Sequence, residues 1–229
     1  MNSKIISICW GTQQTSPTNK SNYQSSLHEN YATAFPEVWI QEQKHGVKGQ
    51  VIISETDLQA WTKQIPEGDY LITQEPNQWI GVLTADCVPM VLFDPVQEVI
   101  AIVHAGWRGT VAKISQIVVQ RLQNEFGVQP ENLQVYLGPS AQSCCYEVDQ
   151  PFLESLQLDQ IAQQCVLQRS GRTFFDVSLY NVLCLKLSGV LECKIDRSAN
   201  ICTICNLNYG SYRRQKDQMD LQLSMVALR

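Results

Sequence analysis

The sequence lacks the features that mark membrane, secreted and nucleic-acid-binding proteins. No apolar run approaches the roughly 20 residues that cross a bilayer, and the short apolar stretch near the start is not followed by a small-residue cleavage site. Acidic residues outnumber basic ones, 22 to 17, which gives a net charge of -5. Because nonspecific nucleic-acid binding depends on excess positive charge, we expect a cytoplasmic protein that binds neither membranes nor nucleic acids.

Histidine is also scarce, and the cysteines do not suit a disulfide framework. The chain has only three histidines, at positions 28, 45 and 104, and it has nine cysteines. An odd number cannot pair completely within one chain, and disulfides are rare in the cytoplasm. We therefore expect the cysteines to be free thiols or metal ligands.

The hydrophobic pattern of this 229-residue chain predicts a mixed α/β fold. Short apolar segments bounded by turn residues predict strands at residues 51–54, 70–73, 79–83, 90–93, 99–103, 135–137 and 221–228. Helical periodicity predicts one helix over 110–126, ended by Gly127, and another from the N-cap Asp176 to Ser188. Residues 1–30 are expected to be irregular or poorly ordered, and 31–229 to form a single catalytic domain.

One predicted hairpin brings two chemically reactive side chains together. Asp94 and Pro95 favour a turn between the strands at 90–93 and 99–103. A two-residue loop would pair residues whose numbers add up to 191, and this register places Cys87 directly opposite His104. Directly opposed side chains lie about 4.5–5.5 Å apart at Cβ, so the thiol and the imidazole could share a metal ion or a proton.

Several interpretations of this pair stay open from the residues alone. The pair could belong to a metal site that needs further ligands, or form a Cys–His nucleophile dyad, while Cys87 could equally be a buried core thiol. His45, in a loop just before a predicted strand, could supply a third ligand. Three protein ligands with one open position are usual for catalytic zinc.

Four motifs resemble one known family, in the expected order. They are TADCVP at 84–89 with HAGWRG at 104–109, LGPS at 137–140, CCYEV at 144–148, and CTIC at 202–205 with SYRR at 211–214. Together they resemble the laccase-domain family, whose members are also called polyphenol oxidase-like proteins, purine nucleoside phosphorylases or peptidoglycan editing factors.

The resemblance implies a fold, a metal site and an activity. The fold would be of the α+β type, with central mixed β-sheets flanked by helices. The family's zinc ligands fall on His45, Cys87 and His104. The implied activity is phosphorolysis of adenosine, inosine and related nucleosides, with methylthioadenosine among them and adenosine deamination as a second activity.

Charged residues near these motifs are candidates for substrate binding and proton transfer. Arg108 follows His104 at the start of a predicted helix, where a guanidinium and helix N–H groups can hold phosphate together. The alternative is that Arg108 only packs on Trp107 or pairs with a carboxylate. Arg213 and Arg214 are further phosphate candidates, with surface ion pairing as the alternative. Asp86 is a candidate proton carrier, and a carboxylate that only bonds turn amides is the alternative.

Other functions remain open at this point. Two histidines and one cysteine also form the ligand set of blue copper, although a laccase needs many more histidines than three. A copper polyphenol oxidase, a Cys–His hydrolase and a peptidoglycan-precursor editing enzyme are the alternatives. The cysteines at 144, 145, 202 and 205 could form a second metal or redox site, or be core and turn thiols.

Overall fold

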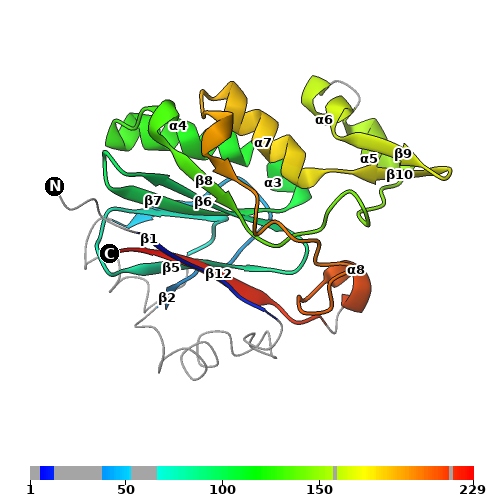
Figure 1. Cartoon of the computed structure of the whole chain (residues 1–229), viewed down its shortest axis with the longest axis horizontal. Helices are drawn as coiled ribbons and strands as arrows, with labels where there is room; N and C mark the ends of the chain where they lie inside the picture. Colours follow the sequence, from blue (N-terminus) through cyan, green and yellow to red (C-terminus); the bar gives the residue numbers. More distant parts are fainter. Residues whose placement is uncertain (1–5, 13–37, 53–65, 157–158, 217–218) are drawn as a thin grey trace.

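The computed structural model describes residues 6–12, 38–52, 66–156, 159–216 and 219–229, and these build three layers (Figure 1). A six-stranded sheet lies in the middle, helices cover one of its faces, and a four-stranded sheet covers the other. This is the mixed α/β, single-domain fold with sheets flanked by helices that the sequence predicts. None of the described helices combines the length and the apolar character needed to cross a membrane.

The middle sheet carries most of the predicted strands, in the order β11-β8-β6-β7-β4-β3. Its members are β3 (Gln50–Ile52), β4 (Tyr70–Thr73), β6 (Val88–Asp94), β7 (Val99–Ala105), β8 (Gln134–Leu137) and β11 (Ile195–Asp196). The two outermost pairs are parallel and the inner pairs are antiparallel. The sheet is therefore mixed, as expected.

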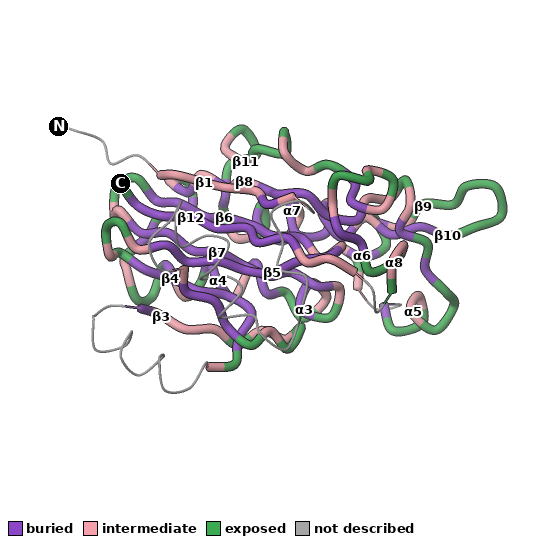
Figure 2. Tube along the Cα trace, turned by 90° about the horizontal axis from the view of Figure 1, so that it is seen from below, coloured by how far each residue is buried: buried purple, intermediate pink, exposed green. Residues whose placement is uncertain are grey.

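The second sheet has the order β1-β12-β5-β2. Its members are β1 (Ile6–Trp10), β2 (Val38–Trp39), β5 (Trp79–Thr84) and β12 (Gln222–Leu228). A separate hairpin joins β9 (Val166–Arg169) to β10 (Arg172–Phe175), and its turn projects from the molecule as an exposed loop (Figure 2).

The central strands are apolar throughout because both of their faces are covered. In β6, Met90 and Leu92 face the helices, whereas Val91 and Phe93 pack between the two sheets. Figure 2 shows these strands as buried along their length. Burial of each such side chain stabilises the fold by about 1.5–3 kcal/mol. The packed core therefore holds the ends of these strands in fixed positions.

The helices begin and end largely where their capping residues predict. They are α3 (Trp107–Val111), α4 (Ile114–Phe126), α5 (Gln150–Ser155), α6 (Gln160–Gln164), α7 (Val177–Leu187) and α8 (Tyr212–Gln215), with short 3-10 turns at Pro130–Asn132 and Glu192–Lys194. Asp176 caps α7 by accepting a hydrogen bond from Leu179 N, and Gly127 ends α4 in the left-handed conformation. The single helix predicted over 110–126 is wrong, because Lys113 has φ 63° and separates α3 from α4.

The predicted register of the β6–β7 hairpin is also wrong. The strands pair Asp94 with Val99 and Pro89 with His104, so facing residues add up to 193 and the loop has four residues. Asp94 Oδ1 accepts hydrogen bonds from the backbone of Val96 and Gln97, and this Asx turn lengthens the loop. The shift is two residues, an even number, so each side chain keeps its face of the sheet.

The prediction that residues 1–30 are irregular needs correction at one segment. Ile6–Trp10 forms β1, an edge strand that pairs antiparallel with β12, Ile6 opposite Leu228. Apolar side chains of β1 also pack against the core between the sheets. Residues 1–5 and 13–30 of the predicted irregular segment lie outside the described residues.

Candidate metal centre and its cavity

Three predicted ligands from distant parts of the chain meet at one end of the two sheets. His45 lies in the loop before β3, Cys87 in the bend between β5 and β6, and His104 near the end of β7. Their candidate ligand atoms all lie within 4.8 Å of one another. The structure therefore brings together every ligand of the predicted metal site.

The hairpin still joins Cys87 to His104 despite the corrected register. Cys87 lies opposite Gly106 when the pairing of β6 with β7 is extended by one residue, so His104 is its diagonal neighbour on the same face. Diagonal neighbours remain within reach of long side chains. The imidazole bridges the extra distance to the thiol.

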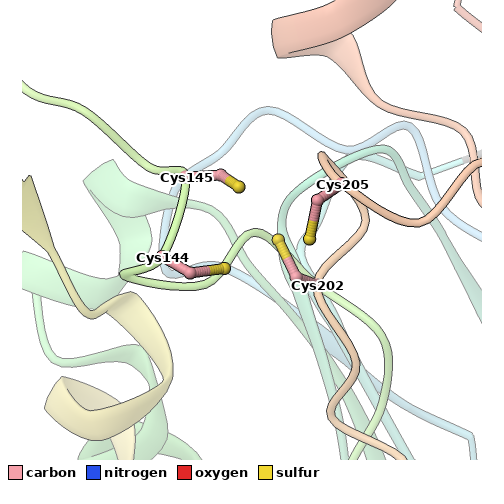
Figure 3. A group of neighbouring side chains, drawn as sticks. All are labelled: Cys144, Cys145, Cys202 and Cys205. Atoms are coloured by element: carbon pink, nitrogen blue, oxygen red, sulfur yellow. The ribbon is translucent and has the colours of Figure 1, made fainter.

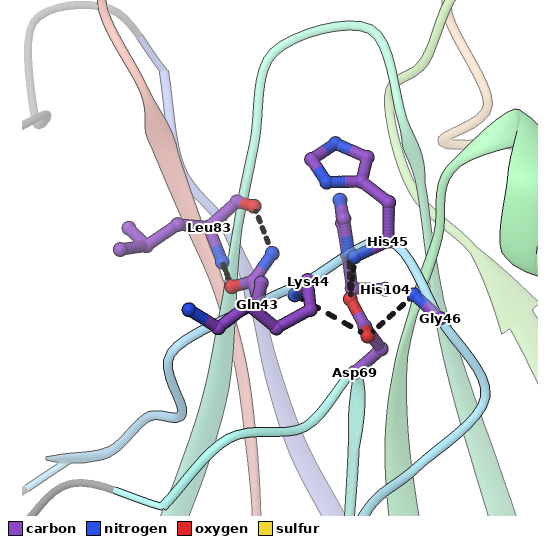
Figure 4. A network of polar contacts seen from close by, with 7 residues as sticks. All are labelled: Gln43, Lys44, His45, Gly46, Asp69, Leu83 and His104. Carbon is purple, nitrogen blue, oxygen red and sulfur yellow. Dashed lines mark hydrogen bonds and ion pairs between the residues drawn. The ribbon is translucent and has the colours of Figure 1, made fainter.

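Asp69 holds two of the ligands in place, and it is not among the predicted site residues. Figure 4 shows its buried carboxylate beneath both histidines. Oδ1 lies 2.8 Å from His104 Nδ1 and accepts a hydrogen bond from His45 N at 2.8 Å, while Oδ2 accepts one from Gly46 N at 2.7 Å. Because Nδ1 of His104 is engaged, its Nε2 is the ring nitrogen left for a metal.

The loop that carries His45 is fixed on two sides. The Gln43 side chain donates to Leu83 O at 2.7 Å and accepts from Leu83 N at 2.8 Å, which ties the loop to β5 (Figure 4). His45 itself has φ 60°, a left-handed conformation that costs free energy for a residue with a side chain. The hydrogen bonds to Asp69 stabilise that conformation and turn the His45 ring toward the His104 ring. The two ring centroids lie 4.8 Å apart.

Gly106 makes room for the ligands. A Cβ at this position would lie 2.7 Å from Cδ2 of His45 and 3.2 Å from Sγ of Cys87. Any larger residue would push His45 and Cys87 apart. The glycine in the HAGWRG motif is therefore required by packing around the site.

The electrostatics favour a thiolate at Cys87. Burial disfavours the charged thiol, but the neighbouring imidazoles of His104 and His45 outweigh it and lower the pKa of Cys87 to about 6. Burial likewise disfavours protonated His104, yet Cys87 and Asp69 raise the pKa of His104 to about 9. At neutral pH the metal-free pair is a thiolate beside an imidazolium, and the thiolate is the form that binds metals.

The donor set fits a borderline-soft divalent metal. Two imidazoles and one thiolate are ligands that zinc accepts, and three protein ligands leave a position open for water or substrate. In such sites a carboxylate usually accepts a hydrogen bond from the ring nitrogen of the ligating histidine that does not bind the metal. Asp69, 2.8 Å from His104 Nδ1, supplies it here.

A cavity of about 690 Å³ opens beside the three ligands, a size typical of small-molecule sites. Among its lining residues are the ligands themselves, the charged residues Asp86, Arg108, Arg213 and Lys216, the aromatic residues Trp107, Tyr146 and Tyr212, and the apolar residues Ile40, Leu83, Met219 and Leu221. The lining thus combines charged, aromatic and apolar side chains.

The predicted phosphate-binding arginines do not all reach this cavity. Arg108 and Arg213 line it, and no carboxylate in the described parts of the chain lies within 4.0 Å of either guanidinium. Arg108 lies over the Trp107 ring and Arg213 over the Tyr146 ring, each 4.5 Å from the centroid. Arg214 instead donates to the backbone carbonyls at positions 203, 204 and 209, so its guanidinium is already occupied.

Asp86 lines the cavity, but both of its oxygens accept hydrogen bonds. Thr203 Oγ1 donates to Oδ1 at 2.7 Å, and the backbone N–H of Arg213 donates to Oδ2 at 2.7 Å. Asp86 also has φ 84°, in the sharp bend that leads to Cys87. These contacts match a carboxylate that bonds turn amides, and its role in proton transfer stays a prediction.

The comparisons with known proteins agree with the resemblance. The family model described as multi-copper polyphenol oxidoreductase laccase matches residues 13–229. A purine nucleoside phosphorylase of Clostridium acetobutylicum is 35% identical over 171 residues, which are 72% of this chain and 68% of the relative. The chain therefore belongs to this laccase-domain family.

Two further relatives are named for different activities. A purine nucleoside phosphorylase of Aquifex aeolicus is 35% identical over 162 residues, covering 71% of this chain and 72% of the relative. An adenosine deaminase from an unknown prokaryotic organism is 33% identical over 150 residues, covering 64% and 56%. The solved structure of the Bacillus licheniformis protein YfiH has a TM-score of 0.85 at 22% identity, covering 98% of this chain and 93% of that one, so it shares the fold.

Proposed function

We propose that this protein is a zinc-dependent, cytoplasmic purine nucleoside phosphorylase that acts on adenosine, inosine and related nucleosides, with methylthioadenosine among them. The observation that carries the proposal is the open ligand set of His45, Cys87 and His104 beside a cavity lined by two arginines without carboxylate partners among the described residues. The names of its relatives in Clostridium and Aquifex support the same activity.

The two arginines are suited to bind the attacking phosphate. Arg108 and Arg213 line the cavity from α3 and α8, two helices that are more than 100 residues apart in the sequence. A guanidinium can grip phosphate through two parallel hydrogen bonds. Stacking on Trp107 and Tyr146 orients both guanidinium groups before phosphate arrives, which lowers the entropic cost of binding.

The apolar residues of the cavity suit the purine and its sugar. Ile40, Leu83 and Leu221 offer apolar surface for a flat heterocycle. Burial raises the pKa of Tyr146 although Arg213 opposes this effect, so the Tyr146 hydroxyl stays neutral and can donate a hydrogen bond to a sugar or base oxygen.

A bound zinc would supply Lewis acidity, which stabilises negative charge that develops on a leaving base or on a water molecule. Asp69 keeps the His104 ring in one orientation, and Gly106 lets the ligands approach closely. Asp69 and Gly106 thus position the metal ligands, the two arginines and the apolar residues of the cavity would bind and orient the substrates, and Asp86 is the proposed proton carrier.

Adenosine deamination is the second candidate, supported by the name of one relative. It uses the same cavity but needs water instead of phosphate. The sequence lacks the His-x-Glu and Pro-Cys-x-x-Cys pattern of the nucleobase deaminases. Any deaminase activity would therefore depend on the His45, Cys87 and His104 site.

The test is incubation of the purified protein, assayed for metal, with adenosine, inosine and guanosine, with and without phosphate. Chromatography should reveal free base and ribose 1-phosphate only when phosphate is present, and Cys87→Ala should show neither. Base release at an equal rate without phosphate would identify a hydrolase and refute the phosphorylase proposal. Inosine formation from adenosine without phosphate would establish the deaminase activity.

A further inference from the structure

Four cysteines outside the cavity form a second cluster. Cys144 and Cys145 lie in the loop after β8, and Cys202 and Cys205 lie in the loop before α8. Figure 3 shows the side chains from the two loops pointing toward one another. Their four sulfurs all lie within 4.8 Å of one another, and none is in a disulfide.

Backbone and side-chain bonds hold the two loops in register. Ser140 N donates to Ile201 O at 3.0 Å, and Thr203 N donates to Ser140 O at 3.0 Å, which forms a short parallel bridge. The Asn200 side chain adds a bond of 2.6 Å to Gly138 O. These bonds hold the two loops together and so keep the four sulfurs close, although the two cysteine pairs are more than 50 residues apart in the sequence.

We propose that Cys144, Cys145, Cys202 and Cys205 bind one structural zinc ion in a closed site of four thiolates. Four sulfurs placed tetrahedrally at about 2.3 Å from zinc lie about 3.8 Å apart, so a small contraction of the observed cluster suffices. The spacing of Cys202 and Cys205, with two residues between them, is the usual spacing of a zinc-binding pair. A single disulfide would use only two of the four sulfurs.

Arginine side chains fasten both loops of the cluster, and one of the sulfurs receives backbone hydrogen bonds. Arg169 donates to Cys144 O at 2.6 Å, and Arg214 donates to Thr203 O and Ile204 O at 2.7 and 2.8 Å. Backbone N–H groups of Cys205 and Gln142 also donate to the sulfur of Cys202. This accounts for Arg214, whose guanidinium fastens the loop between the two cysteines instead of entering the cavity.

The four-cysteine cluster is connected to the cavity by one peptide bond and one hydrogen bond. Cys145 is followed by Tyr146, which lines the cavity, and Thr203 donates to Asp86, the neighbour of Cys87. A zinc that fixes both loops would thus position Tyr146, Asp86 and, through Asp86, Arg213. Its role would be to stabilise this wall of the cavity, without contact to substrate.

The wild-type protein allows a test by thiol labelling. Cys205 and Cys193 are both exposed, so N-ethylmaleimide should modify both readily unless a metal protects Cys205. In zinc-replete native protein we expect rapid labelling of Cys193 and none of Cys205 until a chelator is added, as read by peptide mass spectrometry. Labelling of Cys205 at the rate of Cys193 would overturn the proposal, as would a disulfide between the cluster cysteines.

Metal analysis separates the two sites. We expect two zinc ions per wild-type chain, one in Cys202→Ser, one in Cys87→Ala and two in the control Cys193→Ser. Wild-type zinc content in Cys202→Ser would refute the second site, as would iron in place of zinc. If Cys202→Ser does not fold, the labelling of the wild-type protein still decides the question.

Discussion

Asp69→Asn tests whether the buried carboxylate organises the metal centre. Asparagine has nearly the same shape, so packing is preserved while the charge and one acceptor oxygen are lost. The carboxylate receives bonds from His45 N, Gly46 N and His104 Nδ1, all between 2.7 and 2.8 Å. An amide accepts through one oxygen only, and its NH₂ group must face at least one of these donors.

The structure predicts a loss of zinc affinity at the upper end of the range known for hydrogen-bond partners of metal ligands. Removing such a partner lowers metal affinity by about 10- to 100-fold. Asp69 supports two ligands at once and is 1% exposed, so solvent cannot replace its bonds. We therefore expect zinc affinity to fall by about 100-fold, which corresponds to about 2.7 kcal/mol.

Competition with a chromophoric zinc chelator measures the affinity, and thermal unfolding checks the fold. Asp94→Asn is a matched control, because Asp94 is a buried carboxylate at the opposite end of the β6–β7 hairpin. One oxygen of Asp94 accepts both bonds of its turn, so asparagine can keep them. Zinc affinity in Asp69→Asn within twofold of the wild-type and Asp94→Asn values would refute the role assigned to this residue.

Three further predictions concern the same site. Arg108→Lys should lower the phosphate-dependent rate by about 10- to 150-fold, from the loss of a charged hydrogen bond of about 1.5–3 kcal/mol, and unchanged kinetics at varied phosphate would exclude Arg108 from the site. Gly106→Ala should abolish zinc binding, as measured by metal analysis, since its Cβ would lie 2.7 Å from His45; stoichiometric zinc in a folded variant would contradict this. Between the pKa of Cys87 (about 6) and that of His104 (about 9), zinc must displace the His104 proton, so affinity should rise about tenfold per pH unit from 7 to 8. Calorimetry in buffers of different ionisation enthalpy should then detect about one proton released, and no release would argue against the protonated state of His104.

Local patterns were sufficient for most of the fold and for part of the site. Turn residues and apolar runs predicted β4 at its observed bounds and the strands β5 to β8 to within one or two residues. The meeting of Cys87 with His104 survived a wrong loop length, because a shift of two residues preserves the face of a strand. Lys113 interrupts the helix although apolar periodicity continues through it, and such a backbone change leaves no signal in hydrophobicity.

The supports of the site depend on contacts that local patterns do not contain. Asp69 lies opposite His104 because β4 pairs with β7 in a register in which facing residue numbers add up to 173, and no local pattern in the sequence indicates that these strands pair. Gln43 reaches Leu83, 40 residues away, through its side chain. Arg214 was expected to bind substrate because arginine suits phosphate, but the carbonyls of a neighbouring loop occupy it.

The loop of His45 straddles the boundary between the two sheets. Gln43 ties it to β5 in one sheet, while the backbone of His45 is bonded to Asp69, at the start of β4 in the other. Cys87 lies where the chain itself passes from β5 to β6. A metal bound by His45, Cys87 and His104 would therefore cross-link the two sheets, because sliding of one sheet over the other would change the spacing of its ligands. Metal binding would then stabilise the packing of the sheets, and hydrogen exchange in β5 and in β7 should slow together when the metal is bound.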